Sequence, residues 1–242
     1  MEYFHESNEE CCSIFRTVAR EISSNYTNAQ VGKIMVDSMI APDLTVDWLY
    51  VPAQKQLRKL LVLTSGLHEI EGFTGSAIQL IFSDKILSRL SLDELGDVFI
   101  HGLNPYGFKY FRKVTENNID LNRNCVINPM LYQRINAGYS KMSNLLIPKG
   151  KLSIDKLQYR FFHFNAIYKI IKESLPILRQ AALQGQYEYE KGIYYGGKKM
   201  EPQLVALKPL LKTIFKDYQS ILSVDLHWLR QTWKNAPVLQ SN

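Results

Sequence analysis

The stretch Lys59-Leu60-Leu61-Val62-Leu63-Thr64-Ser65 decides the fold, because it is apolar at almost every position between its two ends. A strand buried on both faces has this continuous apolar pattern, whereas a strand with one solvent-exposed face alternates. We expect the strand itself to cover Leu60–Thr64. Gly66 ends the run, and Gly72–Phe82 then has the pattern of a helix. A buried strand followed at once by a helix is typical of an α/β protein.

Strands and helices continue on both sides of this stretch. Ser7 to Glu10 has the capping-box pattern that opens a helix, and we expect that helix to end near Asn25. The remaining predicted strands are Val31–Val36, Leu44–Val51, Asp97–His101 and Ile221–His227. The remaining predicted helices are Pro129–Leu146, Ile154–Leu183 (long enough for two) and Pro202–Tyr218, with a turn at Asn104-Pro105-Tyr106-Gly107 and a loop at Gly185–Lys199. The sequence therefore predicts an α/β fold with a mixed, mainly parallel sheet flanked by helices, in one domain over residues 1–242.

Composition and charge narrow the class of protein. With 46% hydrophobic and 21% charged residues, the chain is typical of a globular protein rather than a disordered one. The net charge of +6 is scattered and lacks interleaved aromatic residues, so we expect a solvated surface and no nucleic-acid partner. No apolar run reaches 18 residues, which predicts no membrane span. The acidic N-terminus and the three cysteines, which form no disulfide framework, favour a cytoplasmic protein.

Polar residues that follow predicted strands are the candidates for chemistry, because ligands bind beyond the carboxyl ends of strands in open α/β sheets. His68 and Glu71 leave the central strand three residues apart and could both reach one Zn²⁺. His227 ends the last predicted strand and would be the third ligand. A single histidine at a strand end is more often structural, so the combination of the three residues is what indicates a metal.

A second group of candidates is cationic. Arg112, Asn122 and Arg123 follow the predicted turn at Asn104. Arginine binds carboxylates through two parallel hydrogen bonds and stabilises oxyanions, and asparagine adds a neutral donor. Taken alone, these arginines fit surface ion pairs equally well.

Several motifs together resemble a known family. The motifs are SGLHEIEGFTGSAIQ (residues 65–79), NPYGFKYFRK (104–113), NNIDLNRN (117–124), QYEYEKGIYYGG (186–197) and VDLH (224–227). In this order they resemble the zinc carboxypeptidases of the carboxypeptidase A superfamily, most of all a poorly characterised bacterial branch. The likeness runs from about residue 31 to residue 227.

The resemblance implies a role for each candidate. His68, Glu71 and His227 match the ligands of one Zn²⁺, and Arg112 matches the arginine that polarises the scissile carbonyl. Asn122 and Arg123 match the pair that holds the substrate carboxylate. The implied activity is hydrolysis of an amide bond next to a free carboxylate in a small peptide. A deacylase of N-acyl amino acids and a non-catalytic zinc-binding remnant are the alternatives.

The sequence departs from the family at two places. Glu69 stands where the branch often has Gly, and residues 228–242 form an atypical tail with no Asp or Glu. The general-base glutamate of the family thus has no counterpart, so we expect weak or no hydrolysis, an absent C-terminal part and an open sheet edge. Strand alternation would turn Glu69 away from the metal, so we do not expect it to replace the base. A frameshift after His227 is our hypothesis for the tail, and the DNA sequence there would test it.

Overall fold

The computed structural model describes residues 2–68, 70–126, 128–147, 163–164, 167–168, 171 and 175–226. His227, Glu69 and the tail at 228–242 lie outside the described residues. Most of the predicted helix Ile154–Leu183 also lies outside them, and its described end is helix α7.

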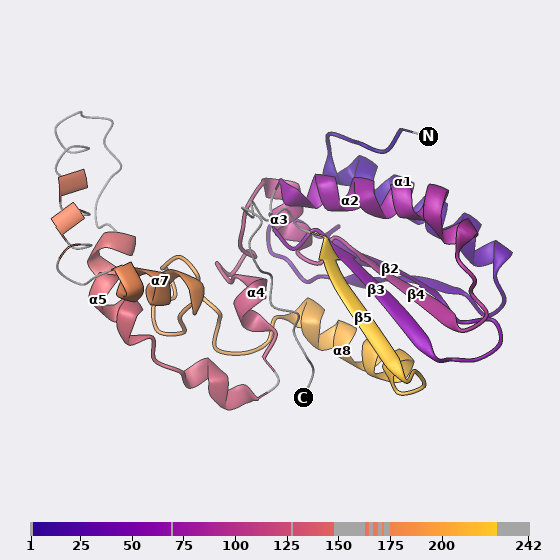
Figure 1. Cartoon of the computed structure of the whole chain (residues 1–242). Coiled ribbons are helices and arrows are strands. Elements are labelled where there is room, and N and C mark those ends of the chain that lie inside the picture. Colours follow the sequence, from indigo (N-terminus) through magenta and orange to yellow (C-terminus); the bar gives the residue numbers. More distant parts are fainter. Residues whose placement is uncertain are drawn as a thin grey trace.

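Figure 1 shows a central sheet with helices on both faces. The strands are β1 (Gln30–Met35), β2 (Thr45–Val51), β3 (Lys59–Ser65), β4 (Leu95–His101) and β5 (Ser220–Leu226). The α-helices with described bounds are α1 (Asn8–Asn25), α2 (Glu71–Ile81), α3 (Pro105–Tyr110), α4 (Leu121–Asn124), α5 (Ala137–Leu146), α7 (Leu175–Leu183) and α8 (Pro202–Phe215). All five predicted strands are therefore present, and so is the capping box, where Ser7 Oγ accepts from the backbone N–H of Glu10 at 3.2 Å.

The sheet has the strand order β1-β2-β4-β3-β5 and is mixed, as predicted. β4, β3 and β5 run parallel, whereas β1–β2 and β2–β4 are antiparallel pairs. Residues 36–44, which join β1 to β2, are too few for the helical crossover that a parallel pair needs. β3 lies between two parallel neighbours, in agreement with its continuous apolar sequence.

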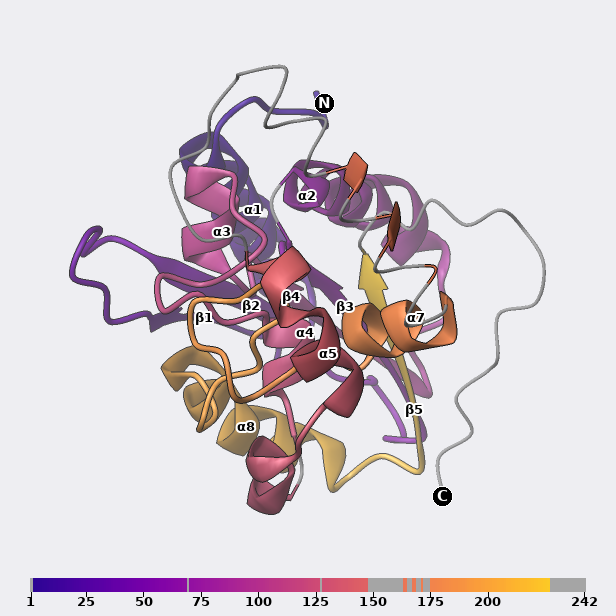
Figure 2. The same ribbon diagram turned by 90° about the vertical axis from the view of Figure 1, so that its left-hand side faces the viewer.

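Two apolar layers hold the helices to the sheet. On one face, Phe15 of α1 packs with Leu49, Leu63 and Phe99 of the strands. On the other face, residues of α8 pack against Val62 and its neighbours. Figure 2 looks onto the end of the sheet toward which β5 points, and it shows α4, α5 and α7 in front of that end.

Two local predictions were wrong, both because of an asparagine cap. The predicted turn at Asn104 is the start of α3, where the Asn104 side chain accepts from the Gly107 N–H at 3.0 Å and Pro105 occupies the first turn. The predicted helix Pro129–Leu146 is a short 3₁₀ turn followed by α5, and Asn136 caps α5 by accepting from Tyr139 N–H at 3.0 Å.

No helix in the described part of the chain combines the length and apolar character needed to cross a bilayer. All three cysteines are free thiols, with Cys11 and Cys12 buried and Cys125 exposed.

Candidate metal centre

His68 reaches the end of the sheet through a close approach of two strand exits. Gly66, directly after β3, has φ +71°, and a Cβ built there would lie 2.7 Å from the Cα of Gly102, directly after β4. The Gly66 carbonyl accepts from the N–H of Asn104 at 2.8 Å. Glycine at position 66 therefore lets the exits of β3 and β4 meet.

Glu71 is the first residue of α2, and this helix lies against the end of β5. A side chain at Gly75 of α2 would collide with the carbonyl oxygen of Leu226, the last residue of β5. Leu226 is paired with Ser65 in the sheet register. The helix that carries Glu71 and the strand that leads to His227 are therefore in contact, although His227 itself lies outside the described residues.

The structure brings His68, Glu71 and Asp120 together. His68 is 7% exposed, its Nε2 lies 3.1 Å from Asp120 Oδ1, and its Nδ1 lies 3.8 Å from Glu71 Oε2. An ionised carboxylate can only accept, so His68 Nε2 is the donor to Asp120, and Nδ1 is the ring nitrogen on the side of Glu71. Among the described residues, the buried Oε2 of Glu71 has no hydrogen-bond partner.

This donor set fits a zinc ion. Two ligand atoms on a tetrahedral Zn²⁺ lie about 3.4 Å apart, given ligand distances of about 2.1 Å. The 3.8 Å separation between His68 Nδ1 and Glu71 Oε2 is close to that value. A carboxylate on the far nitrogen of a ligating histidine is also the usual outer partner in zinc sites.

Asp120 is placed by its own backbone as well as by His68. Its N–H donates to the Tyr195 carbonyl at 2.8 Å, and its Oδ1 accepts from the N–H of Asn122 at 3.0 Å, which caps α4. Burial acts to raise the pKa of the Asp120 carboxyl. The hydrogen bond to His68, with the positive charges of Lys113 and Arg123, outweighs burial and holds that pKa below its usual value.

The predicted substrate residues lie on the segments beside His68. Arg112 is exposed and follows Phe111, whose ring stacks on Phe73 of α2 at 5.7 Å. Asn122 is exposed, and Arg123 is half-buried with its Nη1 donating to the Asn122 carbonyl at 3.1 Å. No hydrogen bond or ion pair within the described part of the chain joins these three to His68 or to one another's side chains. Their roles therefore stay predictions.

Sequence reasoning missed Asp120 and Lys113. Asp120 stands within the NNIDLNRN motif, two positions before Asn122 and three before Arg123. The signal that could have found it is chemical, because a ligating histidine almost always donates its other ring N–H to an acceptor. Lys113 follows Arg112, and its Nζ lies 3.8 Å from Asp120 Oδ2.

A second group of potential ligands is buried under α1. Atoms of Cys12, Asp47 and His101 lie within 4.8 Å of one another, a spacing compatible with a metal site. However, Arg16 Nε is 3.0 Å from both oxygens of Asp47, and His101 Nε2 is 3.0 Å from Ser76 Oγ. Burial raises the pKa of Cys12 to about 12 and lowers that of His101 to about 3. Because Arg16 already balances Asp47, this group is better explained as a structural network.

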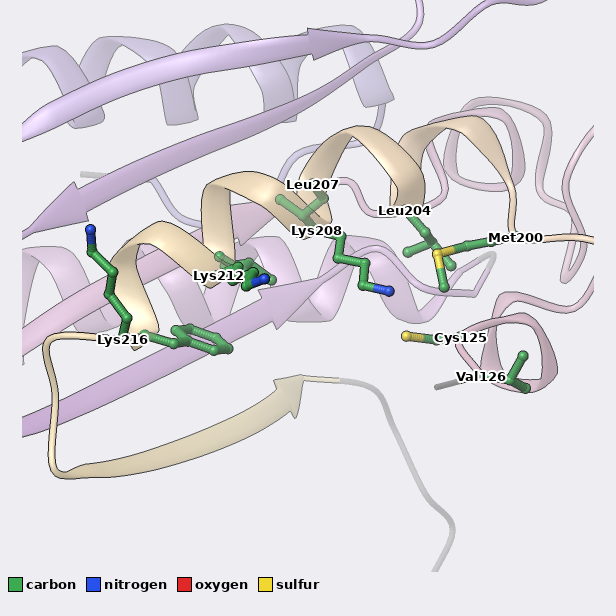
Figure 3. Close-up of a pocket in the computed structure, with 10 residues that line it drawn as sticks. Cys125, Val126, Met200, Leu204, Leu207, Lys208, Lys212 and Lys216 are labelled. Carbon is green, nitrogen blue, oxygen red and sulfur yellow. The ribbon is translucent and has the colours of Figure 1, made fainter. Parts of the chain in front are cut away.

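A cavity of about 630 Å³ lies along α8, away from the residues at His68. Figure 3 shows Lys208, Lys212 and Lys216 along this helix, beside the apolar side chains of Leu204 and Leu207. None of the residues that line the cavity contributes to the candidate metal centre.

Comparisons with known proteins place the chain in a family. The mixed sheet and its flanking helices define an α/β protein. Over residues 9–234 the chain matches, and belongs to, the family described as "Protein of unknown function (DUF2817)". No protein with a curated description matches it.

Among solved structures, the chain is similar to bovine thrombin-activatable fibrinolysis inhibitor in complex with tick carboxypeptidase inhibitor. The identity is 15% and the TM-score is 0.47, with 91% of this chain and 60% of that chain covered. The chain thus spans about 60% of the length of that structure.

Proposed function

We propose that this protein is a zinc-dependent, carboxypeptidase-like hydrolase that acts on an amide bond next to a free carboxylate. The observation that carries the proposal is the arrangement around His68, with Asp120 on one ring nitrogen and Glu71 facing the other. The ordered motifs of the sequence support the same reading. His227 is the proposed third ligand, and the contact between α2 and the end of β5 supports this choice.

The proposed chemistry divides among few residues. Bound zinc would supply Lewis-acid polarisation of the carbonyl and a water of lowered pKa. Arg112 is proposed to hold the oxyanion that develops on the carbonyl oxygen. Asn122 and Arg123 are proposed to bind the substrate carboxylate, which sets the position of the bond to be cleaved.

We expect this chain to catalyse the proton-transfer step of hydrolysis poorly. Within the described residues, the two carboxylates at His68 are Glu71, a proposed ligand, and Asp120, which is engaged by His68. Neither is free to take a proton from water. We therefore propose that hydrolysis is slowed by the roughly 10²–10⁴-fold that general-base catalysis contributes. A non-catalytic zinc-binding protein is the second candidate, favoured by the same observation.

The test is the zinc content of the purified protein after incubation with zinc and dialysis. We expect about one zinc per chain, lost in His68→Ala and lowered in Glu71→Gln, because each variant removes one ligand. His163→Ala is the matched control, since His163 is exposed and should leave the zinc content unchanged. A wild type without zinc, or a His68→Ala variant that retains it, would contradict the proposal.

Substrate assays then separate the candidate functions. Peptides with different C-terminal residues and a panel of N-acyl amino acids should be tested with the zinc-loaded protein. Slow hydrolysis of the peptides, with release of the C-terminal amino acid, supports the peptidase. Hydrolysis of the N-acyl amino acids alone, to the free acid and the amino acid, supports the deacylase. Zinc binding without either product supports the non-catalytic protein.

A further inference from the structure

Lys113 lies behind the candidate metal centre, on the far side of Asp120 from His68. Its Nζ lies 3.8 Å from Asp120 Oδ2 and 5.2 Å from the centre of the Tyr194 ring. That Oδ2 is buried, and no hydrogen bond reaches it from the described part of the chain. The ammonium of Lys113 therefore faces the oxygen of Asp120 that His68 does not use.

Tyr194 holds an unusual backbone conformation beneath this ammonium. Its φ is +59°, in the left-handed region that bulky residues rarely adopt. The surrounding loop imposes the conformation, because Gln186 N–H donates to the Tyr194 carbonyl at 3.0 Å and Tyr139 Oη donates to the Ile193 carbonyl at 2.9 Å. Strained residues of this kind cluster at functional sites, where the strain serves to place a side chain.

The same loop also fixes the backbone of Asp120. The carbonyl of Tyr195, the next residue after Tyr194, accepts from the Asp120 N–H at 2.8 Å. One loop thus holds the main chain of Asp120 and places the ring against which Lys113 rests. A half-exposed lysine on a flexible stem would otherwise sample many positions.

We propose that Lys113 and Tyr194 form a clamp that orients the Asp120 carboxylate, which makes Lys113 a positioning residue of the metal centre. The charge of Lys113 holds Oδ2, so that Oδ1 stays on His68 Nε2. This hydrogen bond fixes the orientation of the His68 ring, with Nε2 donating to Asp120 and Nδ1 on the side of Glu71. The inference rests on the proposed zinc site, and it adds a partner of Asp120, two steps behind the zinc-binding nitrogen of the histidine.

Four variants test the clamp through zinc affinity, measured by competition with a chelator. Lys113→Met removes the charge and keeps the stem, and we expect zinc affinity to fall by up to about tenfold. This is the lower end of the loss for direct partners of zinc ligands, because Lys113 acts through Asp120. Lys113→Arg keeps the charge and should restore most of the affinity. Tyr194→Leu removes the ring and should weaken binding severalfold, whereas Tyr194→Phe keeps the ring and should bind as the wild type does.

A second measurement needs no metal. In zinc-free protein labelled with ¹⁵N-histidine, we expect the Nε2–H form of His68 in the wild type and in Lys113→Arg, and a mixture of both tautomers in Lys113→Met. The His68→Ala variant identifies the signals. If the wild type bound no zinc, the proposed function would fail, and the tautomer would still decide the clamp. The clamp is overturned if Lys113→Met keeps the wild-type tautomer, or if it binds zinc normally and loses only affinity for a small carboxylate.

Discussion

At the scale of single residues, Asp97 is an acidic side chain buried in the described core without a hydrogen-bond partner among the described residues. It lies in β4 between Val51 and Leu61 and is fully buried. Neither of its carboxylate oxygens has a hydrogen-bond partner among the described residues. Burial raises the pKa of Asp97 to about 7, so the folded protein keeps this carboxyl protonated well above the pH at which the unfolded chain releases its proton.

The raised pKa predicts that Asp97 destabilises the fold as pH rises. Between about pH 4 and pH 7 the folded state binds the proton more tightly, so the free energy of unfolding falls across this window. With about 1.4 kcal/mol for each pKa unit, the loss from a pKa near 7 amounts to about 4 kcal/mol above pH 7. Asp97→Asn should remove this loss. The free energy of unfolding by urea at several pH values measures it.

His101 acts in the opposite direction, so the difference between variant and wild type is the quantity to compare. Burial lowers the pKa of His101 to about 3, so the unfolded chain binds this proton more tightly than the folded protein does. The free energy of unfolding therefore falls as pH drops from about 6.5 toward 3. Asp93→Asn, at an exposed carboxylate paired with Lys55, should follow the wild-type curve. A difference between Asp97→Asn and wild type that stays constant from pH 4.5 to 8 would refute the assignment.

At the scale of elements, the side chain of Asn124 joins the short helix α4 to the loop before α8 through three hydrogen bonds. Asn124 is buried, its Nδ2 donates to the carbonyls of Gly196 and Lys199 at 2.8 Å, and its Oδ1 accepts from the N–H of Glu201 at 2.7 Å. Three backbone groups would lose their partner if this side chain were removed. The segment that carries Asp120 is thereby tied to the loop that carries Tyr194.

We expect Asn124→Ala to lower the free energy of unfolding by about 2–4 kcal/mol, because three buried hydrogen bonds are lost. Asn122→Ala is the matched control two residues away, since the Asn122 side chain is exposed and should change stability by less than about 0.5 kcal/mol. Urea unfolding measures the free energy of unfolding of both variants, provided that the dependence of this free energy on urea concentration keeps the wild-type slope. Equal effects of the two variants would show that the connection through Asn124 carries no stability.

The elements that the sequence predicted well are those with a repeating pattern. The continuous apolar run was sufficient to predict strand β3, and the capping box at Ser7 was sufficient to predict the start of helix α1. Asn104 and Asn136 were not sufficient, because an asparagine in a turn and an asparagine that caps a helix have the same sequence signature. Which of the two forms depends on the residues that pack around it.

The contacts of the candidate site also divide into those that sequence spacing predicts and those that it does not. His68 and Glu71 could be paired from their spacing, because three residues across a helix start bring two side chains to one side. Asp120 could not be paired with His68 by spacing, since 52 residues separate them and the loop near Tyr195 fixes the contact. The left-handed Tyr194 leaves no mark in the sequence.

At the scale of the whole molecule, β5 is an edge of the sheet in the described part of the chain. Leu222 on this strand is 63% exposed, and a cavity of about 400 Å³ lies beside it. An exposed apolar edge strand offers unpaired backbone groups to another chain, which makes it an aggregation site. The expected open edge is thus present in the residues that the structure describes.

A charge on this edge should therefore reduce self-association. We expect Leu222→Lys to remain monomeric at concentrations where the wild type forms larger species, as measured by sedimentation velocity. Leu175→Lys is the matched control, because Leu175 is 59% exposed but lies on α7. If both variants reduced association equally, added net charge and not the edge would be the cause.

The pairing of β3 with β5 also determines when the protein can complete its fold during synthesis. Thr64 and Asp225, which are hydrogen-bonded at 2.8 Å, are 161 residues apart in the chain. At about 5–20 residues per second, a ribosome needs roughly 8 to 32 seconds to make the intervening residues. Throughout that interval one side of β3 has no partner strand from its own chain. The apolar run of β3 therefore stays exposed to other chains on that side until β5 has been made.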